Sequence, residues 1–76
     1  MSSLSASEIK AIRALSQKKV RDREGLFVAE GEKIVAEAKE SGADILAIYR
    51  RDEIGEQLMS RISLQDSPSP VLAVIR

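Results

Sequence analysis

The residues best suited to bind a ligand are cations that crowd near the end of the first third of the chain. Residues 17–23 hold four of them within seven positions: Lys18, Lys19, Arg21 and Arg23. A lysine ammonium is a compact point charge and an arginine guanidinium is a planar fork, and both suit phosphate oxygens. Such contacts give an affinity that falls steeply with salt and carries little sequence selectivity. A solvated helix face explains the same residues, and the sequence alone leaves both interpretations open.

Two further cations, Lys10 and Arg13, come earlier, on a predicted helix. At about 100° per residue they gather on the side opposite an apolar stripe. That stripe consists of Ile9, Ile12 and Leu15. The candidate nucleic-acid-binding residues are therefore Lys10, Arg13, Lys18, Lys19, Arg21 and Arg23. Only Phe27 and Tyr49 could stack on bases, which favours recognition of backbone and shape.

Catalytic chemistry has little support in this chain. Without His or Cys there is no thiolate metal site, and the commonest metal ligand and general base is missing. Residues 31–33 read Gly-Glu-Lys, but no Ser or Thr follows Lys33 and no glycine-rich cradle precedes it, so a phosphate loop is not indicated. Acid pairs such as Glu30/Glu32 and Asp52/Glu53 are typical of helix termini. We predict no catalytic, cofactor or metal site here, and therefore no enzyme activity of this chain by itself.

The elements that must position the cations follow from pattern and capping. Ser5 and Glu8 form a capping box at the start of a helix, with Leu4 and Ile9 as its hydrophobic staple. Three short apolar runs alternate with helical segments and are typical of buried strands. The expected order is a helix at 6–16 or beyond, a strand at 26–29, a helix at 32–40, a strand at 45–49, a helical segment at 52–62 begun by Asp52, a connector at 67–70 and a strand at 71–75.

This alternation predicts an α/β fold. Strands separated by helices pair in parallel through right-handed crossovers, and the helices cover the sheet. The predicted architecture is a small α/β/α sandwich with a mainly parallel sheet of three strands, or four if residues 49–66 contain another. The second helix is expected to face inward through Ile34, Val35 and Ala38.

The charge balance is an average over opposed parts. The 76 residues carry twelve Lys plus Arg and twelve Asp plus Glu, so the formal net charge is zero. Residues 1–23 hold six cations against two acids, whereas residues 24–40 hold five acids against two cations. No apolar stretch approaches the roughly 20 residues of a membrane span, and no signal peptide is visible. Composition therefore predicts a cytoplasmic protein that can still present a local basic surface.

The string IKAIRALSQKKVRDREGLFVAEGEKIVAEA, from Ile9 to Ala38, resembles the N-terminal substrate-binding domain of SpoU/TrmH-type RNA 2′-O-ribose methyltransferases. In that family a helix leads into a basic turn, then a strand of the GLFVAEG type, then a helix. The terminal VLAVIR, after a Ser-Pro connector, resembles the strand that closes the domain. The resemblance implies a sandwich like that of ribosomal and kink-turn RNA-binding proteins.

The resemblance also implies roles for individual residues. Lys18, Lys19 and Arg21 match the family's basic turn and would contact RNA. Four residues match its strand and turn motif, with structural roles expected for each. Gly25 would free the turn, Phe27 would pack in the core, and Glu30 would cap or brace the helix start at Gly31.

For the whole protein the resemblance implies a ribosomal or transfer RNA methyltransferase. Residues 1–76 would be one non-catalytic domain excised from it, with the catalytic domain and its S-adenosylmethionine site after residue 76. This domain would be a monomer and the parent enzyme a homodimer. Two alternatives remain: a stand-alone RNA-binding protein of the ribosomal type, and a protein-interaction module that uses the basic helix face.

Overall fold

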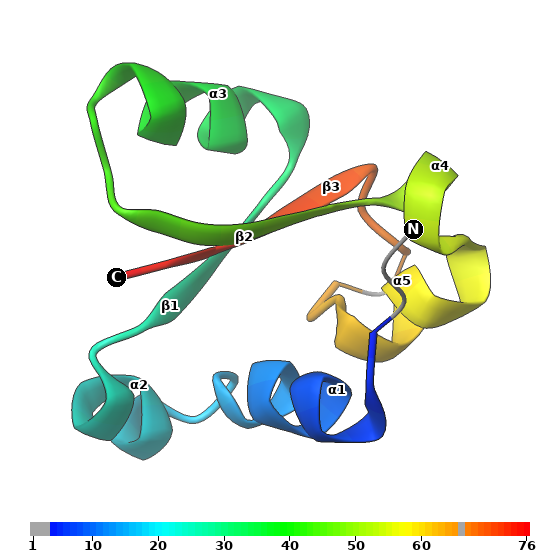
Figure 1. The fold of residues 1–76 in the computed structure, drawn as a ribbon, viewed down its shortest axis with the longest axis horizontal. Coiled ribbons are helices and arrows are strands. Elements are labelled where there is room, and N and C mark those ends of the chain that lie inside the picture. Colours follow the sequence, from blue (N-terminus) through cyan, green and yellow to red (C-terminus); the bar gives the residue numbers. More distant parts are fainter. Residues whose placement is uncertain (1–3, 66) are drawn as a thin grey trace.

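A three-stranded sheet lies between helices on its two faces in the computed structural model, which describes residues 4–65 and 67–76 (Figure 1). Met1–Ser3 and Asp66, which belong to the predicted single domain, lie outside the described residues. In chain order the elements are α1 (Ala6–Ala14), α2 (Lys18–Glu24), β1 (Phe27–Glu30), α3 (Glu32–Glu40), β2 (Ile45–Arg50), α4 (Arg51–Ile54), α5 (Glu56–Ile62) and β3 (Val71–Ile75). The predicted α/β class and sandwich are confirmed.

The predicted strand direction is wrong. The order in the sheet is β1-β3-β2, and β3 pairs antiparallel with both neighbours. The β1 and β2 strands therefore run in the same direction, as expected for strands joined by a helix, but β3 is inserted between them. Strand alternation could not reveal this insertion, because α4, α5 and the connector bring the chain back at the end of the sheet where β2 stops. The part of the chain that the structure describes contains no fourth strand.

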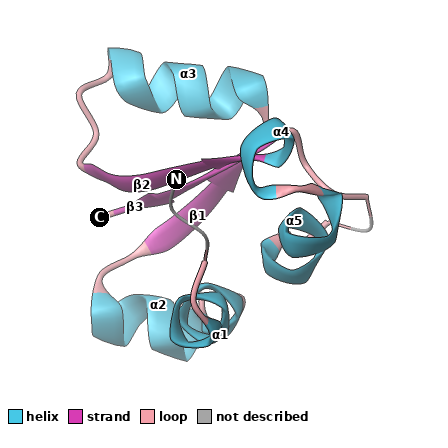
Figure 2. Cartoon of the chain, turned by 45° about the vertical axis from the view of Figure 1, so that its right-hand side comes forward, coloured by secondary structure: helices cyan, strands magenta, loops and turns pink. Residues whose placement is uncertain are grey.

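The central strand divides the core into two halves. Val71, Ala73 and Ile75 face α3, where they pack with Val35 and residues of both edge strands. Leu72 and Val74 point to the other face, which α1, α2 and α5 cover. Figure 2 shows α3 on one side of the sheet and α1 with α2 on the other. All five residues of β3 are buried, which explains its continuous apolar sequence.

The first helix begins as predicted and ends early. The Ser5 hydroxyl accepts the Glu8 amide at 3.1 Å, and the Glu8 carboxylate accepts the Ser5 amide at 3.1 Å. Ile9, Ile12 and Leu15 are buried as the predicted stripe. The helix stops at Ala14, and α2 begins at Lys18 as a separate helix. The helix α2 ends at Glu24, and Gly25 follows it with a left-handed φ of 67°. This conformation is the one that the predicted role of Gly25 in the turn requires.

The predicted helical segment at 52–62 is two helices. Gly55 separates α4 from α5 with a φ of 94°, a conformation that favours glycine. Asp52 lies inside α4 and does not cap it, because α4 begins at Arg51. The break redirects the chain so that Met59 and Ile62 of α5 reach the core beside α1.

Three apolar residues expected in the core are exposed. Phe27 is 46% exposed, Ile34 is 53% exposed and Leu46, in the second strand, is 46% exposed. Phe27 lies on an edge strand that pairs on one side only, and this small sheet does not extend far enough to cover it. In α3 only Val35 is buried and Ala38 half-buried, since a nine-residue helix on three strands has a narrow inner face. Of the three strands that the sequence predicted to be buried, only β3 is buried throughout, and the expectation is wrong for β1 and β2.

Candidate functional site

Most of the cations of α2, the segment in which cations are most closely spaced in the sequence, form ion pairs or hydrogen bonds with neighbouring groups. Lys18 forms an ion pair with Asp22 at 2.7 Å, and Arg23 one with Glu24 at 3.1 Å. The half-buried Arg21 donates from Nη1 to the Leu15 carbonyl at 2.9 Å, which closes the end of α1 against α2. Among the described residues, Lys19 alone of these four cations has neither an ion pair nor a side-chain hydrogen bond.

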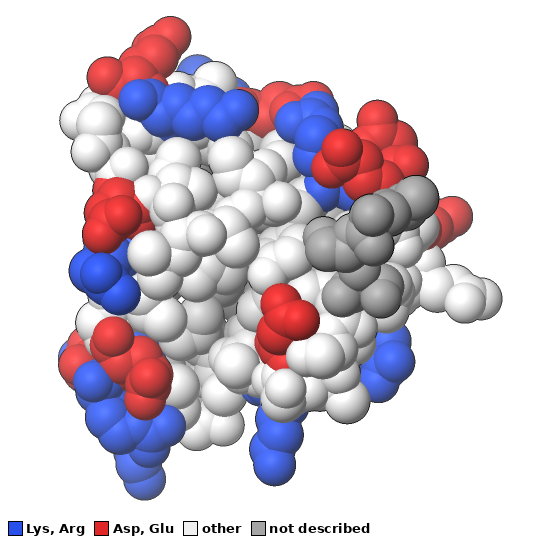
Figure 3. Space-filling view, in the orientation of Figure 1, with Lys and Arg blue, Asp and Glu red and all other residues white. Residues whose placement is uncertain are grey.

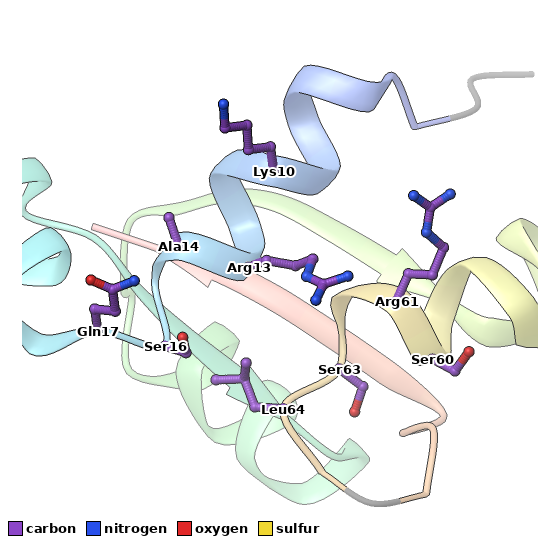
Figure 4. Close-up of a pocket in the computed structure, with 9 residues that line it drawn as sticks. All are labelled: Lys10, Arg13, Ala14, Ser16, Gln17, Ser60, Arg61, Ser63 and Leu64. Carbon is purple, nitrogen blue, oxygen red and sulfur yellow. The ribbon is translucent and has the colours of Figure 1, made fainter.

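A groove of about 510 Å³ runs between α1 and the end of α5. Figure 4 shows Lys10 and Arg13 on α1, Ser60 and Arg61 on α5, and further liners on the segments that follow the two helices. Its lining residues are Lys10, Arg13, Ala14, Ser16, Gln17, Ser60, Arg61, Ser63 and Leu64. The structure thus brings two of the six candidate residues, Lys10 and Arg13, into one groove, and it places the four candidates of α2 outside its lining.

Arg61 is the cation that sequence reasoning missed. It is exposed on α5 and lines the groove opposite α1 (Figure 4). The spacing of Leu58 and Ile62 fits an inward helix face and an outward Arg61, but it does not show which helix Arg61 would oppose. That information exists only once α5 is known to pack on the α1 side of the sheet.

The charged groups that line the groove all have the same sign. All three charged liners are cations, and no Asp or Glu of the described chain lines the groove. Within that part of the chain, Lys10, Arg13 and Arg61 form no ion pair. The Ser16 hydroxyl and the Gln17 amide add neutral donors and acceptors, which suit phosphate and ribose oxygens. The hydroxyl hydrogens of Ser60 and Ser63 are donated to the Gln57 carbonyl and the Glu30 carboxylate, so these two groups can only accept from a ligand.

Other parts of the surface mix the two signs of charge. On the face shown in Figure 3, Lys and Arg lie close to Asp and Glu at several places along the edge, and most of the area between them is uncharged. Pairs of this kind include Arg50 with Glu32 at 2.9 Å and Arg76 with Asp44 at 3.5 Å. Such mixed surfaces give weak fields, so the groove differs in kind from them.

Neither aromatic residue reaches the groove. Phe27 pairs with Ile75, whose side chain belongs to the α3 half of the core, so Phe27 points to the far face of the sheet. Tyr49 packs against the other half of the core. Burial raises the pKa of Tyr49 above 10.0, and the charge and hydrogen bonding of Glu8 raise it further. The described lining of the groove therefore contains no aromatic residue on which a base could stack.

The role predicted for Glu30 is wrong. No side chain caps the start of α3 at Gly31. The Glu30 carboxylate instead accepts hydrogen bonds from Ser63, Leu64 and Ser69, in the connection between α5 and β3.

The described residues hold no group of three or more His, Cys, Asp or Glu that could bind a metal ion. None of the helices in the described part of the chain is long and apolar enough to cross a membrane.

Solved structures similar to this chain include rRNA methyltransferases. An rRNA methyltransferase from Sinorhizobium meliloti matches with 26% identity and a TM-score of 0.84, over 99% of this chain and 36% of that chain. An AdoMet-bound rRNA methyltransferase from the same organism matches with 30% identity and a TM-score of 0.79, over the same shares. A protein from Porphyromonas gingivalis, assigned to the TrmH family of RNA methyltransferases, matches with 30% identity and a TM-score of 0.81, over 95% and 35%. The chain spans about a third of the length of these proteins.

The fold and these matches define a substrate-binding domain of the type that SpoU/TrmH methyltransferases carry. A family model described as the MRM3-like substrate binding domain matches residues 6–55, and the chain belongs to that family. The resemblance found in the sequence is thereby confirmed. No curated protein sequence matches the chain significantly.

Proposed function

We propose that this domain recognises structured RNA, ribosomal or transfer RNA, for a SpoU/TrmH-type 2′-O-ribose methyltransferase, and that it does so through the groove between α1 and α5. The observation that carries the proposal is a groove whose three charged liners are all cations, in a chain of a substrate-binding family. Lys10, Arg13 and Arg61 would contact phosphates, and Ser16 would contact phosphate or ribose oxygens. Ser60 and Ser63 donate their hydroxyl hydrogens within the chain, so they would only accept from ribose hydroxyl groups. Lys18, Lys19, Arg21 and Arg23 stay predicted contacts, of which the exposed Lys19 is the best placed.

The domain contributes binding and orientation, and the chemistry belongs to the rest of a longer protein. The structural neighbours are about three times as long as this chain, and one of them has AdoMet bound. We therefore propose that a catalytic domain follows residue 76 in the parent protein and holds S-adenosylmethionine. The parent would be a cytoplasmic homodimer, and the isolated domain a monomer.

The groove suits the RNA backbone better than the bases. Three cations that neutralise about three phosphates would give a salt slope near three in log affinity against log salt. Without an aromatic side chain in the groove, discrimination among bases is weak. The shape of a folded RNA, and not its sequence, would then decide which molecules bind.

A titration of the 76-residue chain with a transfer RNA and a ribosomal stem-loop, between about 50 and 200 mM salt, tests the proposal. We expect binding that weakens with salt, and Lys10→Ala/Arg61→Ala should weaken it by about tenfold or more. The matched control is Lys33→Ala/Lys39→Ala, which removes two cations from α3 on the far face of the sheet. No binding at low salt, or equal losses in the two double variants, would overturn the proposal.

A further inference from the structure

The carboxylate of Glu30 collects three donors from a segment more than thirty residues away. Its Oε1 accepts the hydroxyl groups of Ser63 and Ser69, each at 2.6 Å, and its Oε2 accepts the backbone amide of Leu64 at 2.8 Å. Hydrogen bonds to an ionised acceptor are short and about twice as strong as neutral ones. The Ser69 side chain is 2% exposed, so this cluster is partly shielded from water.

These bonds fix the segment that leaves α5. Residues 63–65 have no helix or strand structure. Among the described residues, their other hydrogen bonds run from Ser63 to Met59, from Gln65 to Ser63 and from the Ser69 hydroxyl to the Gln65 side chain. The later part of the connection is held by Glu30, through Ser69, and by Arg51, which donates to the carbonyls of Pro68 and Pro70. In the described part of the chain, Glu30 is therefore the sheet residue that hydrogen-bonds directly to residues 63–65.

The fixed segment is also one wall of the groove. Ser63 and Leu64 line it, and Arg61 stands in the last turn of α5 just before them (Figure 4). A charged contact to a phosphate loses strength when its donor is displaced or mobile, because the ordering cost then falls on binding. The position of this wall relative to α1 should thus govern how Lys10, Arg13 and Arg61 act together.

We propose that Glu30 is a positioning residue for the groove: it holds the wall made by Ser63 and Leu64, and with it Arg61, at the spacing from α1 that an RNA backbone needs. This inference rests on the proposed function. A carboxylate near RNA is unfavourable by charge alone. The role of Glu30 is therefore the geometry that its hydrogen bonds impose.

Two substitutions separate geometry from charge. In Glu30→Gln the side-chain carbonyl can accept the Leu64 amide, while the two amide hydrogens are donated to the serine hydroxyls, which also serve as acceptors. Glu30→Ala removes the same charge and all three bonds. We expect Ala to weaken RNA binding by about tenfold and to speed hydrogen exchange of the Leu64 amide by about tenfold or more, and Gln to change either by no more than about threefold. Glu37→Ala, which removes an exposed carboxylate from α3, is the matched control and should change neither.

The outcomes are distinct. If Glu30→Gln weakens RNA binding as much as Glu30→Ala does, the charge of Glu30 and not its hydrogen bonds would explain the loss, and the proposal would be overturned. Faster Leu64 exchange with unchanged RNA affinity in Glu30→Ala would overturn it too. If Glu30→Ala does not fold, Ser69→Ala is the second variant, because it removes one donor that lies outside the groove. It should speed hydrogen exchange of the Leu64 amide and weaken RNA binding, by smaller factors than Glu30→Ala. An unchanged exchange rate of the Leu64 amide would overturn the proposal. Failure of the unchanged chain to bind RNA would defeat the proposed function, whereas Leu64 exchange would still decide whether Glu30 holds the wall.

Discussion

The segment α2 and the groove between α1 and α5 hold similar numbers of cations and use them differently. Four cations stand within residues 18–23, yet three of them contact Asp22, Glu24 or the Leu15 carbonyl. The groove draws Lys10, Arg13 and Arg61 from helices about fifty residues apart, with no acid of the described chain in its lining. Density of charge along a chain is therefore a poor guide to density of charge in space.

The difference follows from helical spacing. Lys18 and Asp22 are four residues apart, and groups at that spacing face each other on a helix. Such an ion pair has almost no net charge, so it lowers the positive potential that the basic segment presents to solvent. The cations of α1 have no such neighbour in the described structure, so their field reaches solvent.

Two matched double variants test whether RNA binds to the groove or to α2. Lys10→Ala/Arg13→Ala should weaken RNA binding by about 10- to 100-fold and lower the salt slope by about two, because two phosphate contacts are lost. Lys18→Ala/Arg23→Ala removes the same charge from α2 and should cost less than about threefold. Both are measured by titration at several salt concentrations. A larger loss in the α2 variant would mean that the basic segment, and not the groove, is the interface.

A second test concerns the structural use of α2. Arg21→Ala leaves the Leu15 carbonyl without its donor, and Leu15 is 3% exposed, so we expect a loss of about 1–2 kcal/mol in the free energy of unfolding. Arg23→Ala, on the same helix, loses only an exposed ion pair and should cost less than about 0.5 kcal/mol. Urea unfolding followed by circular dichroism measures both. Equal stabilities would remove the distinction between these two arginines.

A third test asks whether α1 is held firmly against the sheet, as a groove wall must be. The raised pKa of Tyr49 means that the folded state favours the neutral phenol. The stability this contributes is present below pH 10.0 and is lost as the pH rises through the higher pKa of the folded state. Absorbance of the phenolate follows the titration directly, because Tyr49 is the chain's single tyrosine.

Two variants separate the causes of that pKa shift. Glu8→Gln should lower the pKa of Tyr49 part of the way toward 10.0, since burial still acts and Gln keeps the capping box. Tyr49→Phe should flatten the alkaline loss of stability. An unchanged pKa in Glu8→Gln would mean that α1 and β2 do not hold these two side chains together.

The smallest effect on RNA affinity is expected when the ion pair between Lys18 and Asp22 is removed. Asp22→Asn frees Lys18 from its ion pair, so RNA affinity should rise by no more than about threefold. Stability should change by less than about 0.5 kcal/mol, because the pair is exposed. The same titration measures the gain. A loss of affinity would contradict the view that pairing keeps Lys18 from acting on RNA.

Local signals in the sequence predicted local structure well. The capping box of Ser5 and Glu8 and the stripe from Ile9 to Leu15 depend on neighbours within one or two turns, and both are present. The left-handed turn at Gly25 is equally local. The layered α/β/α arrangement also followed, because alternating apolar runs and amphipathic helices have few ways to bury their apolar faces.

What failed depends on contacts between distant residues. The direction of β3 is set by pairing with strands that begin 44 and 26 residues earlier, at Phe27 and Ile45, and nothing in Val71–Ile75 encodes it. Exposure of Phe27 and Ile34 depends on how far the sheet extends. Arg61 and Glu30 acquire their places in the site only when α5 packs beside α1, so their own neighbours in the chain carried no signal.

The place of β3 has a consequence for synthesis on the ribosome. This strand is the last element of the chain and the only described partner of both β1 and β2. Until residues 71–75 have left the exit tunnel, the two edge strands have no neighbour to pair with, and the helices have no finished surface on which to pack. We therefore expect a nascent chain that stops before Val71 to stay susceptible to proteases, and protection to arise in a single step once β3 emerges.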